Sequence, residues 1–356
     1  MRNKEGDEEQ MELDARKMRI LQAVIDDYIL RAAPVGSRSI SKRADFNLSS
    51  ATIRNEMSDL EEMGLLEQPH TSAGRIPSDK AYRLYVNSIM QRAQLSDEER
   101  KAIRSYFSRR MEEVEAVVKQ TATALSDITR YTAIVLPPQL HAIRLKHLQI
   151  VPVTSDRALL VLVTDAGFIR DAMIRLPEGL TTQDMERLSR MLTQRLSDQR
   201  LDQIAAVEMG ELREKLGQDR VFFNQVMDAI GRNMQPGAQT VELSGATNIL
   251  YYPEYNDVDK AKSFLSAIEG KDTLYRMLKR ASSLEFSVTI GSENDQEELK
   301  DCSVVTATYK IGSDPLGSFG IIGPTRMPYA RILSILEYMS MSLSEALLGV
   351  LDDEQR

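Results

Sequence analysis

Hydrophobic residues in the first quarter of the chain recur three and four positions apart, which is the spacing of amphipathic helices. Asp14 and either Ser49 or Ser50 have side chains that cap helix N-termini, and Gly64 is suited to end a helix. The order of the elements is typical of a helix-turn-helix followed by a wing. The predicted elements are helices over 14–33, 37–44 and 49–63, a short strand over 65–68, a polar loop over 69–77 and a helix over 79–92.

The rest of the chain predicts an α+β fold, because strand-like runs occur early and late with mostly helical residues between them. We expect a disordered lead over 1–13, a winged-helix domain over 14–92, one sheet domain built from 96–177 and 283–350, and an inserted, mostly helical domain over 178–282. The predicted elements are a helix over 97–130 opened by a capping box, strands over 148–153, 158–163, 168–175, 285–290, 302–311 and 316–322, helices over 181–206, 212–233 and 258–281, and a final helix from Pro328.

Composition places the protein among globular proteins, with 42% hydrophobic and 28% charged residues. The longest uninterrupted apolar run, Ala158 to Val163, is far shorter than the roughly 20 residues of a membrane-spanning helix. The first residues are acidic and polar, unlike a signal peptide, and Cys302 has no second cysteine with which to form an internal disulfide. We therefore expect a cytoplasmic protein with no membrane contact.

Charge is distributed unevenly along the chain. The formal net charge is −8, which by itself disfavours nucleic-acid binding, because phosphate contacts need clustered lysine and arginine. Residues 14–92, however, carry more basic than acidic side chains, and between Arg31 and Arg54 five basic side chains stand against Asp45 alone. A basic segment on an acidic chain is often only a solvated surface. Whether this segment binds nucleic acid therefore depends on the motifs around it.

The motifs of common enzyme sites are missing. The sequence contains no G-x-x-x-x-G-K-[ST] phosphate loop, no G-x-G-x-x-G dinucleotide motif and no H-E-x-x-H zinc motif. His141 and His147 are six residues apart, which does not place both on one helical face, and Cys302 is far along the chain. Cys302 lies in a β-rich run and fits a core residue better than a nucleophile. We predict no catalytic residue, no metal site and no cofactor.

The third helix predicts a DNA-reading surface. Its outward face carries Arg54, whose guanidinium can pair with guanine, and Asn55, whose amide can pair with adenine. Its acidic residues lie mostly at the far end, away from the turns that reach base edges. The following loop can lie along a minor groove or phosphate, and Gly74 is expected to give it backbone freedom. The predicted DNA-binding residues are Ser37, Arg38, Ser50, Thr52, Arg54, Asn55, Ser58, His70, Thr71, Ser72, Gly74 and Arg75.

These residues resemble a known family, HrcA, the bacterial heat-inducible transcription repressors. The resemblance covers about residues 13–350 and is most specific in the winged helix. The segments that carry it are Pro34–Arg38, Ser49–Met57, Leu60–Leu66, His70–Pro77, Gly245–Asp257 and Gly320–Met327.

The resemblance implies an architecture and partners beyond those that the residues indicate. It implies a winged-helix DNA-binding domain, a GAF-like domain and an inserted dimerisation domain, for which 178–282 is the candidate. It further implies a homodimer that binds an inverted-repeat operator in double-stranded DNA and represses chaperone operons in the stress response to heat shock. The GroEL chaperonin would help to keep the repressor active. Such a protein is expected to be nucleoid-associated when bound to DNA.

Two other classes of function stay open at this point. One is a winged-helix regulator whose sheet domain senses a small metabolite, although no polar cluster in the sequence demands a ligand. The other is an enzyme with an appended winged helix, against which the missing catalytic motifs already count.

Overall fold

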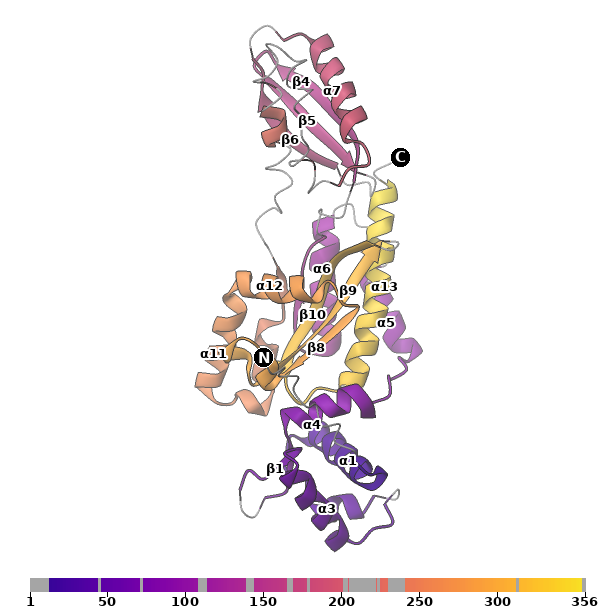
Figure 1. The fold of residues 1–356 in the computed structure, drawn as a ribbon, viewed down its shortest axis with the longest axis vertical. Helices are drawn as coiled ribbons and strands as arrows, with labels where there is room; N and C mark the ends of the chain where they lie inside the picture. Colours follow the sequence, from indigo (N-terminus) through magenta and orange to yellow (C-terminus); the bar gives the residue numbers. More distant parts are fainter. Residues whose placement is uncertain are drawn as a thin grey trace, which may run out of the picture.

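The computed structural model describes residues 13–43, 46–70, 73–107, 114–138, 144–164, 169–177, 180–200, 204, 222, 225–229, 241–311 and 314–353. They form three units stacked along one long axis (Figure 1). We call them the head (13–89), the central domain (97–138 and 241–353) and the insert (144–229). Apart from Leu13, the predicted disordered lead lies outside the described residues.

The head is the predicted winged helix-turn-helix. Asp14 caps the first helix by accepting from the N–H of Lys17 at 2.7 Å, and Ser49 caps the third by accepting from the N–H of Thr52 at 3.1 Å. Gly64 has φ +73°, the left-handed conformation in which glycine ends helices. The head elements are α1 (Ala15–Arg31), α2 (Ser37–Ser41), α3 (Ser50–Glu62), β1 (Leu66–Glu67), β2 (Ile76–Pro77), α4 (Asp79–Leu84) and the π-helical turn η1 (Tyr85–Ile89).

The central domain is a five-stranded antiparallel sheet in the order β7-β3-β10-β9-β8. Its side chains alternate between two apolar clusters, so Ala133 and Val135 face one layer of helices while Ile134 faces the other. The first layer contains α5 (Asp97–Phe107), α6 (Val114–Thr129) and α13 (Tyr329–Asp353), and the second contains α11 (Val258–Glu269) and α12 (Lys271–Ala281). The strands are β3 (Thr132–Val135), β7 (Glu242–Ser244), β8 (Phe286–Ile290), β9 (Cys302–Ile311) and β10 (Asp314–Pro324), with 3-10 turns η4 (Ala246–Tyr251), η5 (Pro253–Tyr255), η6 (Gly291–Glu293) and η7 (Glu297–Leu299).

The insert has a sheet of its own. Strands β4 (Leu145–Thr154), β5 (Arg157–Thr164) and β6 (Ile169–Arg175) form the predicted antiparallel meander, covered by α7 (Thr182–Leu196). We expected these strands to share a sheet with the late strands, but among the described residues they pair with one another in a separate three-stranded sheet. Conversely, α11 and α12 were expected in the insert, yet they pack on the central sheet.

The predicted insert boundaries of 178–282 are therefore corrected at both ends: β4, β5 and β6 lie outside the central sheet, α11 and α12 pack on it, and the described residues of the insert contain strands as well as helices. The physical reason is that local periodicity identifies a strand but not the sheet that it joins. Of the predicted helix over 212–233, only 222 and 225–229 lie within the described residues; the predicted helix over 97–130 is described as α5 and α6. No helix in the described part of the chain could cross a membrane.

Cys302 lies in the core of the central domain, as expected, with 1% of its surface exposed. The Tyr255 hydroxyl lies 2.9 Å from its Sγ, and burial raises the pKa of the Cys302 thiol to about 12. Only the thiolate is a nucleophile, so we expect no reaction of the native protein with an aromatic disulfide reagent at pH 7. The same reagent should label the thiol fully in denaturant. The reaction is measured by absorbance, and rapid stoichiometric labelling of the native protein would contradict this expectation.

Candidate nucleic-acid interface

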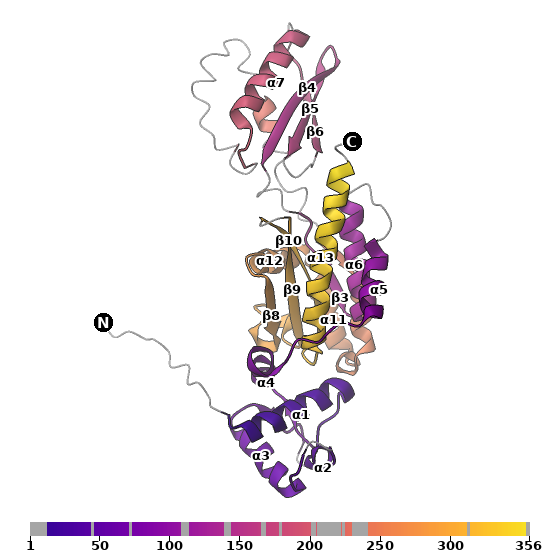
Figure 2. The ribbon, with the colours of Figure 1, turned by 90° about the vertical axis from the view of Figure 1, so that its right-hand side faces the viewer.

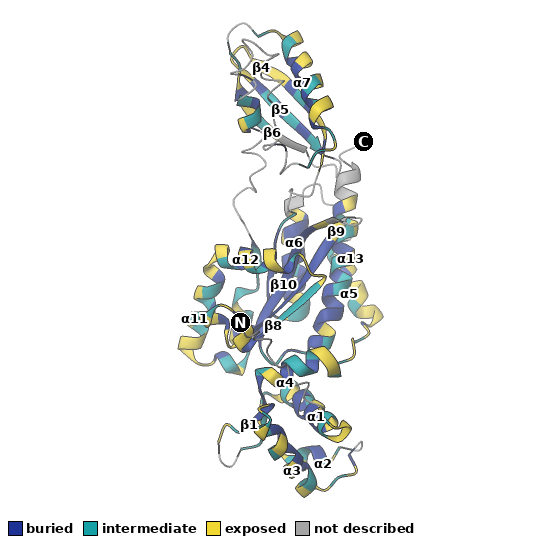
Figure 3. Cartoon of the chain, viewed as in Figure 1, coloured by how far each residue is buried: buried dark blue, intermediate teal, exposed yellow. Residues whose placement is uncertain are grey.

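Helix α3 lies at the end of the molecule remote from the central sheet and presents one face to solvent (Figure 3). Ile53, Met57 and Leu60 are buried against the rest of the head. Arg54 and Asn55 are exposed on the opposite side. A helix that is anchored on one face and polar on the other has the form of a recognition helix. The other predicted residues of this helix, Ser50, Thr52 and Ser58, are half-buried.

The start of α3 is held by hydroxyl groups. Besides its cap to the backbone, Ser49 Oγ lies 2.9 Å from Thr52 Oγ1. Thr52 therefore helps to fix the first turn of the helix. Because the N-terminal turn of a helix has unpaired N–H groups and partial positive charge, it favours a phosphate beside Arg54 and Asn55.

The acidic residue nearest to the reading turns does not face solvent. Glu56 is 6% exposed and forms ion pairs with Arg16 at 2.7 Å and Lys17 at 2.9 Å, both from α1. Lys17 also pairs with Asp59 at 2.9 Å, and hydrogen bonds to Asp59 and Glu56 raise the pKa of its ammonium group. These pairs join α3 to α1 and neutralise carboxylates that would otherwise repel DNA phosphates.

Cationic side chains also hold the turn that leads into α3. The guanidinium groups of Arg19 and Arg43 lie 5.2 Å and 6.0 Å from the ring centre of Phe46. Such cation–π contacts stabilise the turn between α2 and α3. Sequence reasoning missed these residues, although an aromatic residue beside a basic cluster was a usable signal. In the neighbouring α2, Arg38 is exposed and Ser37 is half-buried.

The wing is a two-stranded antiparallel ladder in which Leu66 pairs with Pro77 and Glu67 with Ile76. His70 is exposed, whereas the predicted residues Thr71 and Ser72 lie outside the described residues. Arg75 does not extend from the wing: its guanidinium forms an ion pair with Glu61 at 2.7 Å, and its side chain is 19% exposed.

Gly74 is required for a different reason from the one expected. Its φ is not among the positive values of the chain's glycines. Instead, a Cβ at this position would lie 2.4 Å from the backbone carbonyl group of Val35. The two segments are held together here by two backbone hydrogen bonds between Val35 and Arg75, of 2.8 Å and 2.9 Å. The close approach of the wing to the segment before α2 therefore demands glycine, and the expectation of backbone freedom is corrected.

Arg75→Ala is expected to weaken DNA binding and to reduce the slope of log affinity against log salt by about one unit. A partly exposed ion pair is worth at most about 1 kcal/mol, so a phosphate can replace Glu61 as the partner of Arg75. Titrations at several salt concentrations measure the slope, and Arg75→Lys is the charge-conserving control. An unchanged slope would leave Arg75 with only its role of holding the wing to α3.

Among the described residues, no group of three histidine, cysteine, aspartate or glutamate side chains is arranged to hold an ion. The candidate site is the exposed polar face of α3, which carries Arg54 and Asn55.

Family models match both halves of the chain. A model described as "Winged helix-turn-helix transcription repressor, HrcA DNA-binding" matches residues 12–91, and one described as "HrcA protein C terminal domain" matches residues 115–333. The heat-inducible transcription repressor HrcA of Ruminiclostridium cellulolyticum is 43% identical over 96% of this chain and 100% of its own length. That of Brevibacillus brevis is 41% identical over 94% and 98%.

A solved structure shares the fold. A crystal structure of a hypothetical protein at 2.2 Å resolution aligns with TM-score 0.61 and 24% identity over 95% of this chain and 100% of that chain. This likeness bears on the fold alone, and the family is shown by the family models and the full-length relatives. The chain therefore belongs to the HrcA family of heat-inducible transcription repressors, which are DNA-binding regulators and not enzymes.

Proposed function

We propose that this protein represses chaperone operons by binding an inverted-repeat operator as a homodimer in the cytoplasm, and that the GroEL chaperonin maintains its activity. The observation that carries the proposal is the face of α3, where Arg54 and Asn55 are exposed on an anchored helix. Two such heads related by a two-fold axis would read two half-sites of opposite orientation, which is what an inverted repeat provides.

The dimer surface that we propose is the open face of the insert's sheet. Figure 2 shows α7 on one side of β4, β5 and β6. On the other side, Val151, Val153 and Met173 are 41%, 55% and 54% exposed. Val151 pairs with Leu159, which pairs with Met173, so an apolar row crosses all three strands. Solvent-exposed apolar patches of this kind mark interaction sites, and a second copy of the same face would cover it.

The contribution of the chaperonin is proposed from membership of the family, whose curated relatives are named heat-inducible repressors. A chaperonin that is shared with unfolded proteins supplies a physical link to temperature. Heating diverts it to other clients, the repressor loses its support, and the operons are transcribed.

A mobility-shift titration tests each element of the proposal. The probe is a chaperone-operon promoter fragment with an inverted repeat, compared with the same fragment after one arm or both arms are scrambled. Tighter binding of the two-arm fragment than of the one-arm fragment supports the dimer. A larger fraction of active repressor after refolding with chaperonin supports the proposal that the chaperonin maintains its activity. Equal affinity for the intact and fully scrambled fragments would reject operator recognition.

A further inference from the structure

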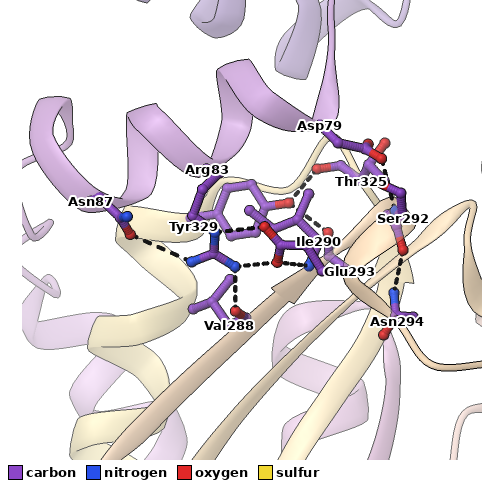
Figure 4. A network of polar contacts seen from close by, with 12 residues as sticks. Asp79, Arg83, Asn87, Val288, Ile290, Ser292, Glu293, Asn294, Thr325 and Tyr329 are labelled. Atoms are coloured by element: carbon purple, nitrogen blue, oxygen red, sulfur yellow. Dashed lines mark hydrogen bonds and ion pairs between the residues drawn. The ribbon is translucent and has the colours of Figure 1, made fainter. Parts of the chain in front are cut away.

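The head meets the central domain through a partly exposed polar contact between α4 and the residues at the end of β8 (Figure 4). Arg83 donates from Nη2 to the carbonyl oxygen of Val288 at 2.6 Å and forms a two-pronged ion pair with Glu293, with Nε 2.7 Å from Oε1. Glu293 Oε2 also accepts from the N–H of Ile290 at 2.8 Å. Bidentate arginine–carboxylate pairs fix direction as well as distance, so this contact orients α4 on the sheet.

A second contact lies at the start of the same helix. Asp79 Oδ2 accepts from the N–H of Ser292 at 2.8 Å. Gly291 has φ +52°, and a Cβ there would lie 2.2 Å from the Asp79 carboxylate oxygens. A side chain at position 291 would therefore be strained by the left-handed backbone and would displace the Asp79 carboxylate from its contact.

A third contact ties a different part of the head. Arg326, from the connection between β10 and α13, donates from Nη1 to the carbonyl oxygen of Ile29 at 3.0 Å, in the last turn of α1. It pairs with Glu254 and lies over the ring of Tyr252 at 5.6 Å, and only 11% of its side chain is exposed. A cation is favourable at a helix C-terminus, where carbonyl groups lack partners within the helix.

The segment that connects the two domains is also fastened. Ser334 of α13 donates to the carbonyl oxygen of Ala93 at 2.7 Å, and Arg92 pairs with Glu337 of α13 at 2.9 Å. The head is therefore held at α4, at α1 and along its connection, and it cannot turn about residues 90–96 without breaking several of these contacts.

We propose that Arg83, Asp79 and Arg326 are positioning residues that fix the head on the central domain and thereby set the half-site spacing that the dimer accepts. The inference rests on the proposed dimeric binding of an inverted repeat. A head on a flexible linker would reach half-sites at many separations. When each head is held in one orientation, the second head has a high effective concentration at its half-site only if the separation of the two half-sites matches the distance between the heads.

The test uses duplexes selected from random DNA by the wild-type protein. The selected two-arm duplex is compared with a one-arm duplex and with duplexes that carry one to three added or removed base pairs between the arms. The variants are Arg83→Ala, Arg83→Glu and Arg83→Glu with Glu293→Arg. The matched control is Arg280→Ala, which removes an exposed ion pair with Asp295 inside the central domain.

Arg83→Ala should bind the one-arm duplex like the wild type, because α3 is untouched. On the two-arm duplex it should lose about tenfold in affinity and should discriminate less between spacings. The reversed pair should recover spacing discrimination relative to Arg83→Glu, and Arg280→Ala should match the wild type. Circular dichroism checks that each variant is folded.

Two outcomes would overturn the inference. One is an Arg83→Ala protein with wild-type affinity and an unchanged spacing profile. The other is an equal loss on one-arm and two-arm duplexes, which would assign Arg83 to the stability of the head itself. If the wild-type protein shows no preference for two arms over one, the proposed dimeric function fails instead, whatever the variants do.

Discussion

Arg54→Ala and Asn55→Ala are each expected to lower specific operator affinity by about 1–3 kcal/mol per head, while affinity for random DNA falls much less. Both side chains are exposed in the first turns of α3, and the residues that anchor this helix lie on its other face. Either change therefore removes a base contact without opening the core. Competition titrations with the selected operator and with random duplex separate the two affinities.

Arg31→Ala is the matched control for this prediction, since Arg31 is an exposed arginine of the head in the last turn of α1. It should bind both DNAs like the wild type. If Arg54→Ala loses affinity equally on operator and random DNA, Arg54 contacts phosphate and the base-reading role is wrong. Operators with a changed base at one position can identify which base each side chain reads, because the variant should no longer discriminate there.

The architecture of the head could be predicted from the sequence because its signals are local. The caps at Asp14 and Ser49, the glycine at 64 and the spacing of apolar residues each act within one or two turns of helix. The structure confirms all of them. The fold class was confirmed for the same reason, since runs with strand and helix periods follow one another along the chain.

The partition between central domain and insert could not be predicted in this way. The strands over 145–175 and those over 286–324 have the same local pattern, and only the pairing separates them into two sheets. Helix α12 has an apolar face that suits either unit, and it packs on the central sheet through Leu274 and Leu278. Contacts between distant segments decide such questions, and a single sequence does not display them.

In the candidate interface, too, features that depend on local sequence could be predicted, and features that depend on contacts between distant segments could not. The exposure of Arg54 and Asn55 follows from helical periodicity, and the structure places them as expected. The partner of Arg75 and the close approach of Gly74 to Val35 depend on how the wing folds back over the head. Likewise, nothing local marks Arg83, whose partner Glu293 is 210 residues away.

The largest effect is expected from charges placed on the open face of the insert. Val151→Glu combined with Met173→Glu should convert a dimer into a monomer, because an unpaired carboxylate is costly to bury in an apolar contact. Both residues lie on the exposed row that crosses β4, β5 and β6, so the monomer should remain folded. Operator affinity should fall about 10²–10⁴-fold, toward that of one head on one half-site, since the second head is no longer held nearby.

Sedimentation measures the oligomeric state, and a titration of the two-arm duplex measures the loss of affinity. Met341→Glu is the matched control, since Met341 is 57% exposed on α13 of the central domain, close to the 54% of Met173. The control should stay dimeric and bind the operator normally. The wild type and the double variant should bind the one-arm duplex equally. The loss of affinity for the two-arm duplex would then result from the loss of the dimer and not from damage to the head. If the double variant sediments as a dimer with wild-type operator affinity, the open face is not the surface that joins the two copies.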